Sequence, residues 1–90
     1  MAQVFIPRRL QPLTAGRKQV TVTAATVRQV IEALEVECPG IKAKLYDAEG
    51  DALARGMAVT IDGVTGERGL LEQVGPESEV HFLPAIAGGR

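Results

Sequence analysis

Apolar and polar residues alternate along four separate stretches of this chain, which is the pattern of strands with one buried face. These stretches cover residues 3–6, 19–23, 53–61 and 79–83. The loop over residues 11–18 contains Pro12 and Gly16, two residue types that favour turns. We therefore expect the first two strands to form an antiparallel hairpin. The third strand is expected to end at the Asp62-Gly63 turn.

One segment has the helical period instead. Its apolar residues fall on a single stripe, as in a helix that packs on a sheet: Val27, Val30, Ile31, Leu34 and Cys38. Thr26 and Gln29 have the spacing of a capping box, which predicts the start of the helix. Pro39-Gly40 predicts its end, because proline disfavours helical geometry in the preceding residue. On the polar side, Arg28 and Glu32 predict a weak surface ion pair.

Only short elements are predicted between the helix and the last strand. Residues 41–46 could form a helical turn, residues 47–51 a polar turn, and Leu70-Leu71 a turn anchored to the core. With one long helix, the fold must bury one helix stripe against one sheet face. If the last strand lies parallel beside the first, the helix provides the crossover. The order predicts an α+β β-grasp fold with a mixed sheet of four to five strands.

Composition and charge narrow the function classes. Ten basic and eleven acidic residues give a net charge of −1, which argues against a nucleic-acid footprint, and Arg8-Arg9 is interpreted as solvated loop charge. One cysteine permits no internal disulfide and favours a reducing compartment. The N-terminus lacks a secretory pattern, and no apolar run approaches the ~20 residues of a membrane span. We therefore expect a cytoplasmic protein without a membrane partner.

Candidate catalytic and metal-binding residues are few. Cys38 and His81 are the only cysteine and histidine of the sequence, whereas a structural zinc site uses about four such ligands. Cys38 continues the apolar stripe and is interpreted as a core residue. His81 alternates with buried positions and is expected to point away from the core. Gly63, Gly66 and Gly69 lack the lysine and serine of a phosphate loop. The sequence thus predicts no self-sufficient active site.

The C-terminal segment is the remaining candidate. We expect a domain over residues 1–83 and a flexible tail over residues 84–90, in which Pro84 ends the strand. The residues of the tail are small and apolar, whereas disordered tails are normally polar. The alternative is a frayed chain end, where glycines are common. Fully extended, the residues from Pro84 to Gly89 reach roughly 20 Å. A partner-binding surface is predicted at four apolar residues: Leu83, Pro84, Ala85 and Ile86.

In these features the chain resembles the MoaD/ThiS family of ubiquitin-like sulfur carriers, which includes the small subunit of molybdopterin synthase. The resemblance covers nearly the whole chain and is most specific over residues 80–89, where a strand, a proline, small apolar residues and Gly-Gly follow one another. Supporting matches are Val4-Phe5-Ile6-Pro7, Leu13-Thr14-Ala15-Gly16, Ala25-Thr26-Val27-Arg28, Pro39-Gly40-Ile41 and Ile61-Asp62-Gly63.

The resemblance implies a carrier mechanism. A ubiquitin-activating-type enzyme would adenylate the Gly89 carboxylate with ATP, and a persulfide would convert it to a thiocarboxylate. Gly88, Ala87 and Ile86 would thread into that enzyme, and the exposed sheet face would help to dock it. ATP would bind the partner, so no cofactor is expected to bind this chain tightly. An acceptor synthase in molybdopterin, thiamine, cysteine or methionine biosynthesis would receive the sulfur.

Arg90 departs from the family's usual Gly-Gly ending. The resemblance suggests a precursor from which a JAMM-type metalloprotease removes Arg90. The alternative is a non-carrier β-grasp module that binds a partner without carrying sulfur. Fold alone does not separate these two functions.

Overall fold

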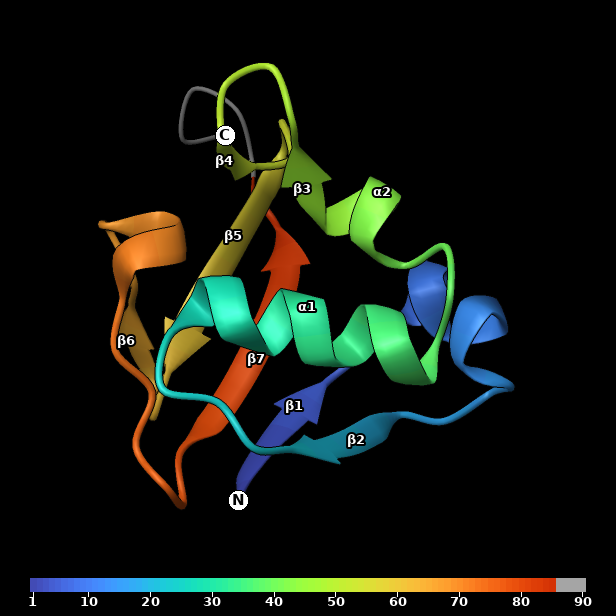
Figure 1. The fold of residues 1–90 in the computed structure, drawn as a ribbon, viewed down its shortest axis with the longest axis horizontal. Helices are drawn as coiled ribbons and strands as arrows, with labels where there is room; N and C mark the ends of the chain where they lie inside the picture. Colours follow the sequence, from blue (N-terminus) through green and yellow to red (C-terminus); the bar gives the residue numbers. More distant parts are fainter. Residues whose placement is uncertain (86–90) are drawn as a thin grey trace.

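Helix α1 (Val27–Glu37) lies across one face of a mixed sheet in the computed structural model, which describes residues 1–85 (Figure 1). The strands are β1 (Ala2–Phe5), β2 (Gln19–Val22), β5 (Met57–Ile61), β6 (Val64–Thr65) and β7 (Glu79–Pro84), in the spatial order β2-β1-β7-β5-β6. β1 pairs antiparallel with β2 and parallel with β7, and β7 pairs antiparallel with β5. The predicted β-grasp arrangement is therefore confirmed, with α1 in the crossover.

The remaining elements are short, and the sequence predicts them less well. They are η1 (Arg8–Thr14), α2 (Lys42–Leu45), β3 (Tyr46–Asp47), β4 (Ala52–Leu53) and η2 (Gly69–Leu71). The helical turn near residue 42 is confirmed, but the expected loop begins as the 3-10 helix η1. Leu53 belongs to β4, not to the third strand as predicted. Gly56, with a φ of +78°, interrupts the extended chain before β5.

The start of α1 follows the capping prediction closely. The Gln29 backbone N–H donates to Thr26 Oγ1 at 3.2 Å, as expected for an N-cap. Gln29 Oε1 accepts from the Ala25 N–H at 2.8 Å, one residue earlier than a capping box requires.

The predicted ion pair between Arg28 and Glu32 is wrong. Arg28 binds Asp51 and Glu32 binds Lys42, with nitrogen–oxygen distances of 2.9 and 2.6 Å. Both residues find partners outside α1. For Arg28 the reason is geometric, because a carboxylate facing the guanidinium can accept two parallel hydrogen bonds.

The core lies between α1 and the inner face of the sheet. The α1 stripe is buried as predicted, and Cys38 is a core residue with 2% of its surface exposed. The inner sheet face contributes side chains from four strands: Val4, Val20, Val22, Val59, Val80 and Phe82. Leu70 is buried, but Leu71 is 60% exposed, so only the first residue of that pair anchors η2.

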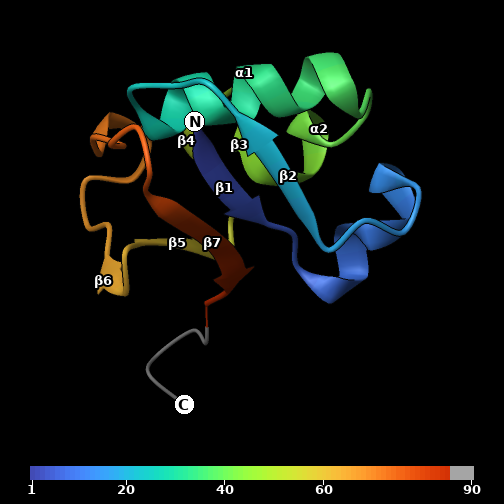
Figure 2. The ribbon, with the colours of Figure 1, turned by 90° about the horizontal axis from the view of Figure 1, so that it is seen from below.

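The chain leaves the sheet at the end away from its N-terminus. Because β7 is parallel to β1, its C-terminal end lies opposite the residue at which the chain begins (Figure 1). Figure 2 shows α1 and α2 together on one side of the sheet, with β7 leading out of it. This end of β7 is where the predicted functional segment begins.

Candidate functional site at the end of strand β7

Leu83, Pro84 and Ala85 are the predicted site residues that the structure locates. Leu83 pairs with Ala58 and Pro84 with Met57, so β7 runs one residue beyond its predicted end. The Ala85 N–H then donates to the Gly56 carbonyl oxygen at 2.7 Å. The other predicted residues (Ile86, Ala87, Gly88, Gly89 and Arg90) lie outside the described residues.

Attachment through Ala85 shortens the segment that is available to enter a partner. With Pro84 in the sheet and Ala85 hydrogen-bonded to Gly56, the part of the covalent chain that runs from this anchor to Gly89 is residues 86–89. Four extended residues span at most roughly 14 Å, compared with roughly 20 Å when the count starts at Pro84. A partner that engages Gly89 without unpairing Ala85 must therefore come close to the end of β7.

A pocket of about 290 Å³ lies beside this anchor. Its walls come from η1, α2, the start of β5 and the end of β7, segments that are far apart in the sequence. The apolar lining residues are Pro7, Leu10, Met57, Phe82, Leu83 and Pro84. Leu10 and Phe82 are buried, whereas Leu83 and Pro84 are exposed, so the pocket joins the core to the root of the tail.

The charged residues that line this pocket are all cationic. Arg8, Arg9, Lys44 and Arg55 are exposed, and no carboxylate of the described residues lines the pocket. None of the four forms an ion pair with a carboxylate of residues 1–85. Arg8 and Arg9 are exposed, which is consistent with their interpretation as solvated charge. They lie in the 3-10 helix η1 instead of a loop, and Lys44 and Arg55 line the same pocket. The sequence analysis did not identify this cluster.

The outer face of the sheet carries a stacked pair of rings. Phe5 and His81 lie parallel with 4.2 Å between their ring centroids. His81 is half-exposed and its Nε2 lies 3.9 Å from Glu79 Oε1, so the prediction that it faces away from the core is confirmed. A shallow hollow beside these rings includes Thr60 and Leu83. Leu83 therefore borders both this hollow and the basic pocket.

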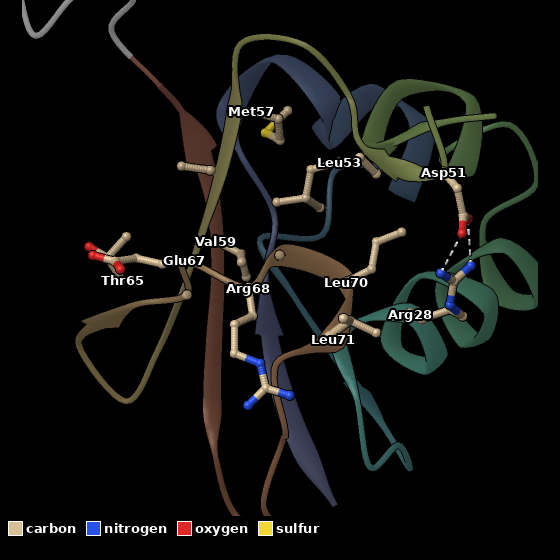
Figure 3. Close-up of a pocket in the computed structure, with 14 residues that line it drawn as sticks. Arg28, Asp51, Leu53, Met57, Val59, Thr65, Glu67, Arg68, Leu70 and Leu71 are labelled. Carbon is tan, nitrogen blue, oxygen red and sulfur yellow. Dashed lines mark hydrogen bonds and ion pairs between the residues drawn. The ribbon is translucent and has the colours of Figure 1, made fainter. Parts of the chain in front are cut away.

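A second hollow, of about 500 Å³, is lined by Leu53, Val59 and Leu70 (Figure 3). It shares Met57 with the basic pocket but none of the four cations. At its side, Arg28 Nη1 and Nη2 donate to the two carboxylate oxygens of Asp51 at 2.9 and 3.0 Å. These contacts connect α1 to the turn between β3 and β4.

The Asp51 carboxylate is also the acceptor of the Tyr46 hydroxyl, at 2.7 Å. The hydrogen bonds from Arg28 and then from Tyr46 lower the pKa of Asp51 to about 2. A carboxylate this acidic is a poor general base at neutral pH, so we interpret the cluster as structural.

Among residues 1–85, no group of three or more His, Cys, Asp or Glu side chains is arranged to hold a metal ion. Cys38 Sγ is buried and accepts a hydrogen bond from Arg17 Nη2 at 3.4 Å. In the same described part of the chain, no helix is long and apolar enough to cross a membrane.

Comparison with known sequences gives matches over nearly the whole chain. The model of the ThiS family matches residues 4–89, so the match includes Gly88 and ends at Gly89. The sulfur carrier protein CysO of Mycobacterium tuberculosis is 33% identical over an alignment of 89 positions, which covers 96% of this chain and 96% of that one.

Solved structures that match the chain also include CysO proteins. A chain in the crystal structure of the Amycolatopsis orientalis BexX/CysO complex superposes with a TM-score of 0.88 and 34% identity, covering 99% of this chain and 100% of that one. The crystal structure of Mycobacterium tuberculosis CysO gives a TM-score of 0.88 and 29% identity, with coverages of 96% and 100%.

Proposed function

Because the chain belongs to the ThiS family of ubiquitin-like sulfur carriers, we propose that it is a sulfur carrier protein. It acts as a protein co-substrate that is reloaded after each transfer, not as a catalyst. The observation that carries the proposal is the family match, which runs from Val4 through both tail glycines and stops at Gly89. The reacting group is then the Gly89 carboxylate.

The proposed loading takes place in three steps. A carboxylate oxygen of Gly89 attacks the α-phosphorus of ATP on the partner enzyme, and pyrophosphate leaves. A persulfide sulfur of a donor protein attacks the carbonyl carbon, and AMP leaves. A thiol then reduces the resulting acyl disulfide, which releases the thiocarboxylate and leaves a disulfide on the donor side. ATP binds the partner throughout.

The position of the tail root supports this role. The end of β7 is exposed at Leu83, Pro84 and Ala85, and the anchor at Ala85 limits the reach beyond it. Glycine at the last two positions removes the Cβ atoms that would obstruct a narrow channel. The activating enzyme is therefore expected to bind against the end of the sheet.

Arg90 must be removed before Gly89 can be activated. We propose that a JAMM-type metalloprotease hydrolyses the Gly89–Arg90 peptide bond. The family match excludes Arg90, which supports a role for this residue as a processed extension. Curated relatives at 33% identity are named sulfur carrier protein CysO, and on this basis we propose cysteine biosynthesis as the pathway.

The test compares the full chain with a chain that ends at Gly89. Each is incubated with ATP, a persulfide donor and the ubiquitin-activating-type enzyme encoded in the same genome, and its intact mass is measured. The chain ending at Gly89 is expected to exchange one oxygen for sulfur, and the full chain to remain unchanged. Adenylation of the full chain would contradict the removal of Arg90. Absence of sulfur in both chains would favour a β-grasp interaction module.

A further inference from the structure

Four cations surround an apolar pocket at the root of the tail. Arg8 and Arg9 come from η1, Lys44 from α2, and Arg55 from the segment before β5. The whole chain has a net charge of −1, so this concentration of positive charge is a property of one place on the surface. Like charges held close together repel one another, and within residues 1–85 no carboxylate lines the pocket to offset them.

The pocket also offers apolar surface to a binding partner. Met57, Leu83 and Pro84 are half-buried or exposed along its walls, above the buried Phe82. An apolar centre with a charged rim is the usual anatomy of a protein–protein interface. Arginine is suited to such a rim because its planar guanidinium binds a carboxylate through two hydrogen bonds.

We propose that this pocket docks an acidic segment of the activating enzyme that receives the tail. An apolar side chain of that segment enters the pocket, and its carboxylates bind the cations of the rim. The inference rests on the proposed function, and it specifies the chemistry of the partner. Charge complementarity points to acidic residues, because every charged group on the rim is a cation. The anchor at Ala85 points to the protein that receives the tail.

Position explains why this partner must approach the pocket. Beyond the hydrogen bond from Ala85 to Gly56, residues 86–89 reach at most roughly 14 Å. An enzyme that holds Gly89 in its active site is thus held within that distance of Ala85, which directly follows Pro84 in the pocket wall. Attraction between the rim and acidic residues would orient the carrier before the tail enters, and it would weaken as salt increases.

Binding of single-residue variants to the ubiquitin-activating-type enzyme from the same genome tests the proposal. Dissociation constants are measured without ATP, at low and high salt, for chains ending at Gly89. Arg55→Glu is expected to weaken binding by roughly tenfold at low salt, with a smaller effect at high salt. Arg55→Lys is expected to lose less affinity than Arg55→Glu, because it keeps the charge and loses only the paired hydrogen bonds of the guanidinium.

Arg68→Glu is the matched control. Arg68 is also exposed and forms no ion pair within residues 1–85, but it borders the hollow of Figure 3 and does not line the basic pocket. Its substitution changes net charge by the same amount and is expected to alter affinity less than about twofold. Thermal unfolding of each variant verifies that the fold is intact.

The outcomes separate this proposal from the proposed function. Equal affinities for Arg55→Glu and Arg68→Glu would overturn the docking pocket, even if the chain ending at Gly89 still acquired sulfur. Selective weakening by Arg55→Glu without any sulfur loading would support the pocket and overturn the carrier function. A chain ending at Gly89 that does not bind the enzyme at low salt would contradict both.

Discussion

Asp51 depends on the fold for both its charge state and its backbone conformation. It accepts hydrogen bonds from Arg28 and Tyr46, and its pKa falls from an ordinary 3.8 to about 2. Its φ of +49° lies in the left-handed region, which aspartate and asparagine tolerate better than most residues. Asparagine is therefore a suitable replacement, since it removes the charge and keeps the backbone.

We expect Asp51→Asn to lower stability at neutral pH and to have little effect in acid. A carboxyl whose pKa is lower in the folded state stabilises the fold above its unfolded pKa, near 3.8, and loses this effect as pH falls toward about 2. Denaturant unfolding of both proteins between pH 7 and pH 2 measures the difference. Glu49→Gln, at an exposed residue of the same turn, is the control. A difference that stays constant with pH would contradict the assignment.

Gly89 is the residue on which the proposed function depends most. We expect Gly89→Ala to reduce thiocarboxylate formation by roughly a hundredfold or more, because a methyl group in a narrow channel displaces the reacting carboxylate. The change adds one methyl group beyond the last strand, so thermal unfolding is expected to be unchanged. Ala87→Gly is the control and is expected to load normally. Normal loading of Gly89→Ala would argue against threading through a tight channel.

At the scale of elements, capping fixes the start of α1. Thr26 Oγ1 accepts the Gln29 N–H, and Gln29 Oε1 accepts the Ala25 N–H, so side chains satisfy one free donor of the first turn and the N–H of the residue before the N-cap. Both interactions are local, which is why the sequence predicts the position of this terminus. The later segments β3 and β4 have two residues each and depend on pairing with one another.

Thr26→Ala is expected to destabilise the protein by about 1 kcal/mol, the usual cost of losing an N-cap side chain. Thr23→Ala, at an exposed position before the cap, is expected to change stability by less than about 0.5 kcal/mol. Urea unfolding of both variants measures the two values. Equal effects would mean that the Thr26 side chain does not cap α1.

At the scale of the whole molecule, one core joins α1 to the sheet. Leu34 is fully buried, so Leu34→Ala is expected to cost roughly 2 to 5 kcal/mol through lost apolar burial and the cavity left behind. Val36 lies in the same helix with 83% of its surface exposed, and Val36→Ala is expected to cost less than about 0.5 kcal/mol. Chemical denaturation of both variants measures the contrast. Similar losses would place α1 in another orientation.

The spacing of residue types along the chain is enough to identify the main strands, the helix stripe and the Gly-Gly tail. A face that must be buried imposes a period of two on a strand and about 3.6 on a helix, so Val20, Val22 and Leu34 are identifiable from spacing alone. The tail is identifiable because Pro84 is followed by small apolar residues and two glycines. These signals are local and do not depend on how distant segments pack.

Which distant residues meet depends on how the folded chain packs. Arg28 binds Asp51 across 23 positions instead of Glu32, and Ala85 is anchored to Gly56. The basic pocket brings Arg8 together with Arg55, which lies 47 positions away. Charged side chains on exposed positions have no period that marks their partners. Their neighbours are set by where the crossover and the turns place each segment, and the spacing of residues along the chain does not encode that placement.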